Sequence, residues 1–506
     1  MTKTLYKTLA GSTMYLAAMS SSAMAQVSAE EVWANWTSYA ESLGQTMTVG
    51  TQNRRGDTLS LENIQFGMEM PEGKAGGVVD LIELRERGDG TVEITMSPEM
   101  IMSIALDPEQ GESVNMTLTV TQAGLAMVAS GTPEVLSYDY LASQLSISID
   151  DLVADGQKTE GDIKFSISDI DGAYTVTEGE MRQVTSEMSA MQANLAMDIT
   201  DPTDQTRIQM SGSYDDFKTS SDMMVAKNLS VDDPAWFFNG GLNGSGTLTT
   251  GATKYNMSVL GDNGPMTVDA TAADSQITFS IEDGSLAYGG ETNDLNYSLI
   301  GAMIPFPSVN MAMAQAAFEL KMPTTKTNEP RDFGLLTRFS ELTISDAIWN
   351  MFDPGGQLPR DPATLVIDFA GKMNFLVDFM SAKETGEMAE DGKMPAEIHE
   401  LSINEVRLKL AGADIQGSGN FTFDNSDLQT FGGMPAPTGT VDISIEGVNG
   451  LMETLVGMGL LPQDQAMGAR MMLGMFAQPA AGPDSLTSKI EVRGNGSVFA
   501  NGQQIK

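Results

Sequence analysis

Residues 277–281 read Ile-Thr-Phe-Ser-Ile, and this alternation of apolar and polar side chains decides the fold class. Side chains of a β-strand point to opposite faces in turn, so a two-residue period predicts a strand with one dry and one wet face. The same period recurs along nearly the whole chain, for example at residues 92–96, 116–120, 145–149 and 441–445. We therefore predict a mainly β protein of large, twisted antiparallel sheets, arranged as an open groove or a sandwich.

Helical spacing interrupts the strand pattern in three places. Ser28 and Glu31 form a capping-box sequence, and Gly44 follows the apolar stripe that begins after them. These signals predict an N-terminal helix that docks on a sheet. A short helix is expected near residues 344–352, and a helical pair split by a proline is expected at about residues 450–476.

The first 25 residues have the pattern of an export signal. Lys3 and Lys7 precede a short apolar stretch, and Ala23-Met24-Ala25 provides the small residues that signal peptidase requires. Gln26 stands where a lipoprotein would carry cysteine. We predict a cleavable signal peptide, cut after Ala25, and a periplasmic location for the remainder.

Charge and composition narrow the range of partners. The 506-residue chain has 68 acidic and 28 basic residues, a formal net charge of -40; loss of Lys3 and Lys7 with the leader makes it -42. This charge repels phosphate backbones, so no nucleic-acid partner is expected. No cysteine is present for disulfides, and no later apolar run approaches the roughly 18 residues of a spanning helix. We predict two β-rich regions, residues 26–232 and 233–506, the second with helical insertions; the oligomeric state cannot be read from the sequence.

Motifs for catalysis are missing from the sequence. It contains no Gly-x-Ser-x-Gly elbow, phosphate-binding loop or dinucleotide fingerprint, and His399 is its single histidine. We expect His399 to be an ordinary surface residue rather than a general base. The stretch from Asp169 to Gly172 lacks the full spacing of a calcium loop and is expected to be a turn at the rim of a sheet. We accordingly predict no catalytic, cofactor-binding or metal-binding residues and no cofactor.

A proline-rich loop is the most constrained segment. Three prolines within residues 353–362 fix their own backbone angles and restrict the residues before them. The loop is expected to be a structural clasp between a helix end and a strand, with recognition of a partner as the alternative. The candidate residues are Asp353, Pro354, Pro359, Arg360, Asp361 and Pro362.

Methionine is unusually frequent, at 37 residues. Pairs such as Met311 with Met313 and Met471 with Met472 have three readings. They fill an irregular core, line a groove that adapts to varied apolar ligands, or supply thioether ligands to copper. Core packing is the leading interpretation.

Several short stretches together resemble domain of unknown function family 2125, found in exported proteins of alphaproteobacteria. They are residues 358–364, 421–427, 434–439, 459–462 and 501–503, with Val32-Trp33 and Pro305-Phe306-Pro307 in agreement. The resemblance implies an envelope location in a Gram-negative cell and implies no activity.

Three functional hypotheses follow. The leading one is a non-enzymatic envelope factor that offers an apolar groove or sheet edge to a lipid or an envelope protein. The second is a carboxylate-dependent hydrolase of an envelope polysaccharide, which needs two carboxyls facing across a cleft. The third is a structural scaffold.

Overall fold

The computed structural model describes residues 26–70, 72–108, 113–154, 156–227, 240–282, 284–378 and 395–506, with 384, 386 and 388. The predicted signal peptide and the predicted boundary at residues 232/233 lie outside these residues. The described helices are α1 (Ala29–Ser42), α3 (Asp346–Phe352), α5 (Val448–Gly457) and α6 (Gln463–Phe476). No helix among the described residues is long and apolar enough to cross a membrane.

Strands make up most of the described chain. Those before residue 230 are β1 (Gln45–Arg55), β2 (Thr58–Met70), β3 (Gly73–Glu86), β4 (Val92–Met96), β5 (Glu99–Leu106), β6 (Val114–Ala123), β7 (Ala126–Thr132), β8 (Val135–Ala154), β9 (Gln157–Lys158), β10 (Glu160–Thr177), β11 (Met181–Thr200) and β12 (Arg207–Ala226). The later strands are β13 (Leu242–Thr250), β14 (Thr253–Gly261), β15 (Gly264–Ala272), β16 (Asp274–Glu282), β17 (Ser285–Gly301), β18 (Val309–Pro323), β19 (Arg331–Ile344), β20 (Ala363–Phe375), β21 (Ala396–Leu410), β22 (Ala413–Asp424), β23 (Ala436–Glu446), β24 (Gln478–Pro479), β25 (Ser485–Val492), β26 (Val498–Ala500) and β27 (Gln503–Gln504).

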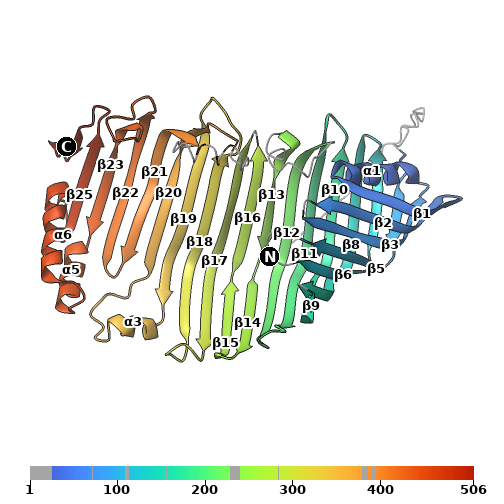
Figure 1. The fold of residues 1–506 in the computed structure, drawn as a ribbon, viewed down its shortest axis with the longest axis horizontal. Coiled ribbons are helices and arrows are strands. Elements are labelled where there is room, and N and C mark those ends of the chain that lie inside the picture. The colour runs from blue at the N-terminus through green and yellow to red at the C-terminus, as the bar shows by residue number, and fades with distance from the viewer. Residues whose placement is uncertain are drawn as a thin grey trace, which may run out of the picture.

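All of these strands belong to one sheet, and all their pairings are antiparallel. The order follows the sequence closely, because most strands pair with the next strand along the chain. At two places in the sheet, two pairs of shorter strands lie between two long strands. Between β3 and β8 these pairs are β4–β7 and β5–β6, and between β12 and β17 they are β13–β16 and β14–β15. Figure 1 shows the result, a long twisted ribbon of strands. The predicted fold class is confirmed as a single continuous sheet.

Helices α1, α5 and α6 lie at the two ends of this ribbon, and α3 lies along its lower edge between β19 and β20 (Figure 1). α1 contacts β1, β2 and β3, whereas α5 contacts β22 and α6. The capping box predicted at Ser28 is present: the backbone N–H of Ser28 donates to Glu31 Oε2 at 2.8 Å, and the Glu31 N–H donates to Ser28 Oγ at 3.3 Å. The predicted helix near residues 344–352 is α3. The helical pair forms as α5 and α6, with Pro462 at the N-cap of α6.

The largest core lies under α1. Apolar residues of α1 pack on side chains from β2, β3, β4 and β8, such as Leu59, Leu84 and Ile94. The ring of Tyr138 stacks on that of Tyr174 at 4.4 Å between centroids, and its hydroxyl donates to Asn35 Oδ1 at 2.9 Å. One helix therefore seals the apolar face of the sheet at its N-terminal end.

Aspartates in the left-handed backbone region lie in the middle of long strands. Asp169 has φ 50° within β10, and Asp216 has φ 49° within β12. The expected turn at Asp169–Gly172 is therefore wrong: Asp tolerates positive φ, and the chain continues as a strand. The kink at Asp169 shifts the alternation of buried side chains by one residue. Ile167 before it and Ile170 after it are both buried in the same cluster, although they are three residues apart. The same face of the sheet thus stays apolar on both sides of each kink.

Candidate functional site: an uncovered apolar face

Apolar side chains cross the middle of the sheet in three rows, which glycines and hydroxyl residues interrupt and the third of which is apolar only from β18 onward. Residues directly opposite each other on neighbouring antiparallel strands project from the same face. From β13 to β22 the first row is Leu248, Ile277, Gly290, Phe318, Thr337, Ile367, Val406 and Gly417; the second is Gly246, Phe279, Tyr288, Leu320, Leu335, Phe369, Ile403 and Gly419; the third is Thr250, Ser275, Thr292, Ala316, Phe339, Leu365, Leu408 and Ile415. We call the face that carries these rows the apolar face.

Large side chains in these rows are open to solvent. Ten of them are 36 to 47% exposed, although residues of these types are usually buried in proteins. Scattered exposed apolar residues are ordinary, but a contiguous set marks a binding surface. The ten are Ile277, Phe279, Tyr288, Phe318, Leu320, Leu335, Phe339, Val406, Leu408 and Ile415.

A hollow of about 640 Å³ lies on this face, and residues of strands from β10 to β19 line it. Phe165, Leu195 and Tyr214 line it from one side, and Ile277 and Phe318 line it from the other. Its volume lies within the range of pockets that hold small apolar ligands. The polar groups at its edge are mostly hydroxyls, from residues such as Thr250, Ser275, Thr292 and Thr337.

Glycines let aromatic rings lie flat on the sheet. A Cβ added to Gly290 would lie 2.6 Å from Phe318 Cε1, and one added to Gly246 would lie 2.4 Å from Phe279 Cε1. Both distances are far shorter than a carbon–carbon contact, so only glycine permits these ring positions. The rings of Phe318 and Tyr288 also meet at 5.4 Å between centroids. Glycine spacing therefore shapes the floor of the apolar face.

The opposite face of the same strands is charged. Arg407 donates to Asp414 at 3.1 and 2.6 Å, and Arg338 lies 4.0 Å from Glu405. The hydrogen bonds that Arg407 donates to Asp414 raise the pKa of this guanidinium and keep it charged. Because ion pairs gather on one face and apolar rows on the other, the sheet is two-sided along β19 to β22.

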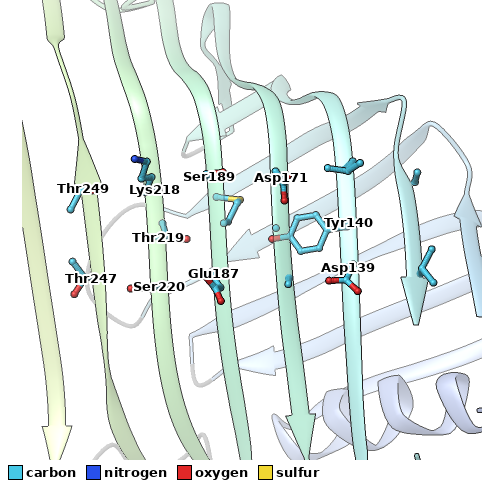
Figure 2. A pocket seen from close by; sticks show the side chains of 16 residues that line it. Asp139, Tyr140, Asp171, Glu187, Ser189, Lys218, Thr219, Ser220, Thr247 and Thr249 are labelled. Carbon is cyan, nitrogen blue, oxygen red and sulfur yellow. The ribbon is translucent and has the colours of Figure 1, made fainter. Parts of the chain in front are cut away.

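A second hollow, of about 680 Å³, lies on the polar face of β8, β10, β11, β12 and β13. Figure 2 shows Asp139, Asp171, Glu187 and Lys218 around it, on neighbouring strands. All three carboxylates are exposed. Raising the pKa of a catalytic acid requires burial or a close carboxylate partner. Asp353 is the single buried acid of the described residues, so no buried carboxylate pair favours the hydrolase hypothesis there.

The proline-rich loop predicted as a clasp joins α3 to β20. Asp353 accepts hydrogen bonds from the backbone N–H groups of Gln357 at 2.8 Å and Leu358 at 2.9 Å, and these bonds lower its pKa. Arg360 donates to Asp346 and to Asn350 Oδ1 at 2.8 Å, and its guanidinium lies over the ring of Trp349.

Of the other predicted loop residues, Pro354 follows Asp353, Pro359 lies against Gly412, and Asp361 and Pro362 lead into β20. The structure thus brings Asp353 and Arg360 together around the end of α3. This arrangement fits a clasp, while recognition of a partner by the loop stays a prediction.

His399 lies in β21, where its Nε2 is 2.6 Å from Oδ1 of the buried Asn374. The Asn374 amide in turn donates to the backbone carbonyl of Thr327 at 3.2 Å. Among the residues that the structure describes, no group of three or more His, Cys, Asp or Glu side chains is placed to hold a metal. The histidine therefore joins two strands and a connecting segment.

Sequence reasoning predicted strands with one apolar face, but not which residues of different strands lie side by side on that face. The alternation at residues 277–281 was visible, whereas its alignment with Leu320, Leu335 and Leu408 depends on strand register. The signal available in the sequence was the pairing of strand glycines with phenylalanines in later strands, as at Gly290 and Phe318.

Comparisons with known proteins give a family and no activity. A family model described as "Uncharacterized protein conserved in bacteria (DUF2125)" matches residues 265–503. No curated protein matches the chain. A solved structure, the ferric citrate transporter FecA in the unliganded form, matches with 8% identity over 91% of this chain and 76% of that chain. The TM-score of 0.16 is too low to indicate a shared fold.

The family match contains every stretch on which the resemblance was based except Val32-Trp33. The resemblance is therefore confirmed for the later part of the chain. That part holds β15 to β27, with most of the exposed apolar rows. The match over residues 265–503 supports the suspected relation to the DUF2125 family.

Proposed function

We propose that the protein is a non-enzymatic factor of the bacterial envelope that binds a lipid, or another amphiphile with an acyl chain, along its apolar face. The observation that carries this proposal is the set of apolar rows from β13 to β22, in which ten large side chains of β16 to β22 are exposed to solvent. A contiguous exposed apolar surface promotes aggregation unless a ligand or partner covers it. The predicted export signal supports a periplasmic location.

The dimensions of the apolar face suit an acyl chain. Eight neighbouring strands at about 4.8 Å a step span roughly 34 Å. One leaflet of a membrane contributes about 15 Å of hydrocarbon, half of the bilayer core. A lipid tail therefore fits along the rows with room to spare.

A lipid explains the position of the rows better than a protein strand does. A partner that adds a strand to a sheet binds at an edge, where backbone groups are unpaired. The rows instead cross central strands, whose backbone groups are paired on both sides. The net charge of -40 further favours an amphiphile with a neutral or zwitterionic head group.

Two measurements test this proposal. Native mass spectrometry after mild purification should show bound lipid. After delipidation, the neutral fluorescent probe 1-N-phenylnaphthylamine should bind, and the double variant Phe318→Thr/Leu320→Thr should bind it on the order of tenfold more weakly, because two large apolar contacts are lost. Threonine keeps a strand former at both exposed positions.

The matched control is the double variant Leu260→Thr/Ile300→Thr. These side chains are 56 and 49% exposed but project from the opposite face, since their neighbours Val259 and Leu299 carry the apolar alternation. The control should bind the probe like the unmodified chain. Lipid-free protein that also fails to bind the probe, or equal loss in both variants, would contradict the proposal.

A further inference from the structure

Helix α6 presents a ridge of methionines to solvent. Met467, Met471 and Met475 are 63, 66 and 58% exposed, and their four-residue spacing places them on one side of the helix. Each step along this ridge is about 6 Å. We call these three residues the methionine ridge.

Further apolar residues extend the ridge. Met472 in α6 and Leu460 in the turn before it are 58 and 51% exposed. The opposite side of α6 holds the buried Ala466. The outward side of this helix is therefore apolar as well, whereas an ordinary surface helix is polar on that side.

Charge is depleted where the ridge lies. Residues 448–476 contain Glu453, Asp464 and Arg470 as their only charged residues, and Arg470 pairs with Glu453 at 3.1 Å. The rest of the chain carries nearly all of the net charge of -40. This end of the molecule is thus the part whose approach to another surface meets little electrostatic repulsion.

The ridge is fixed to the end of the sheet. Figure 1 shows α5 and α6 beyond β25, at the extremity of the ribbon. Ser488 in β25 and Asn501 both donate side-chain hydrogen bonds to the carbonyl of Phe476, the last residue of α6. A flat surface can therefore meet α6 without meeting the body of the sheet.

We propose that α6 and the turn before it form a membrane-surface contact, with the methionine ridge lying in the interface of a neutral, zwitterionic bilayer. Helices with one apolar side lie in this way at the boundary of head groups and acyl chains. A convex ridge of long, flexible side chains suits a fluid surface, whereas a folded protein partner would need a matching groove. Anionic lipid is disfavoured by the acidic body.

Binding to vesicles tests the proposal on the full mature chain. The unmodified protein should cosediment with phosphatidylcholine vesicles, with little dependence on salt because the ridge carries no charge. The triple variant Met467→Gln/Met471→Gln/Met475→Gln should lose on the order of tenfold or more in partitioning. Glutamine has nearly the same helix propensity as methionine, so α6 should persist.

The matched control is Met191→Gln/Met303→Gln/Met434→Gln. These methionines are 65, 76 and 58% exposed and lie outside α6. The control should bind vesicles like the unmodified protein. Absence of vesicle binding, equal loss in both triple variants, or self-association of the chain that the ridge variant abolishes would each overturn the proposal.

The membrane contact is separable from the lipid site. The double variant Phe318→Thr/Leu320→Thr should still bind vesicles, and the ridge variant should still bind 1-N-phenylnaphthylamine. If the first variant also lost vesicle binding, the apolar face rather than α6 would be the membrane contact, and the proposal would be wrong.

Discussion

At the scale of single residues, Arg182 fastens α1 to the sheet. Its side chain is buried; it donates to Glu178 Oε1 at 2.7 Å and to the hydroxyls of Ser38 and Ser42 at 2.9 Å each. Removing a buried donor leaves the groups that accept its hydrogen bonds, here the Ser38 and Ser42 hydroxyls, without that partner. This contact joins α1 to β11.

We expect Arg182→Met to lower the free energy of unfolding by about 1–3 kcal/mol, because the buried hydrogen bonds to Ser38 and Ser42 are lost while the partly exposed Glu178 keeps its ion pair with Lys227. Urea denaturation followed by tryptophan fluorescence measures the change, because Trp33 and Trp36 lie in α1. Arg207→Met is the control, since Arg207 pairs with Asp198 on the surface and should change the midpoint little. Equal midpoints for the two variants would contradict this account.

At the scale of elements, Asp484 holds the start of α5. Burial opposes its ionisation, but the N–H groups of Gly450 and Asn449 and the Asn449 amide favour the carboxylate, so its pKa is lowered. A carboxyl whose folded pKa lies below its unfolded value of about 3.9 stabilises the fold above that value. This stabilisation is lost as the pH falls through the folded pKa.

We therefore expect the α5–α6 pair to loosen below about pH 4. Limited proteolysis or hydrogen exchange of residues 448–476 at pH 7 and at pH 3 measures the change. Asp484→Asn keeps an acceptor oxygen but removes the charge, so this variant should be less protected at pH 7 and should change less on acidification. Amides of α1 provide the internal reference. An unaltered acid response in the variant would refute the role of Asp484.

The sequence predicted elements better than it predicted their arrangement. The capping box at Ser28 and the split before Pro462 are local signals, and both gave the correct helices. The turn predicted at Asp169 was wrong because an aspartate–glycine stretch is typical of turns. Aspartate is favoured in turns partly because it tolerates positive φ, and the same property lets Asp169 take a left-handed conformation inside a strand. The backbone preference of the aspartate was therefore identified correctly, but pairing with the neighbouring strands decides whether the segment is a turn or a kinked strand.

At the scale of the whole molecule, two different stretches of one sheet are stabilised differently. The N-terminal strands bury their apolar side under α1, whereas β13 to β22 expose theirs. The sequence predicted an N-terminal helix that docks on a sheet, but it did not predict which strands that helix covers, because Leu59 and Leu335 occupy similar alternating patterns. Which strands stay uncovered is decided by the tertiary structure.

This contrast predicts an uneven response to an amphiphile. Adding lysophosphatidylcholine below its micellar concentration should slow hydrogen exchange in β16 to β22, because a ligand that binds only the folded face stabilises the strands it covers. Amides of β2, β3 and β4 under α1 should exchange at unchanged rates, since their apolar side is already buried. Hydrogen exchange with peptide resolution, with and without the amphiphile, measures both regions at once. Uniform protection along the chain, or protection confined to β2 to β4, would show that the uncovered rows are not where the amphiphile binds.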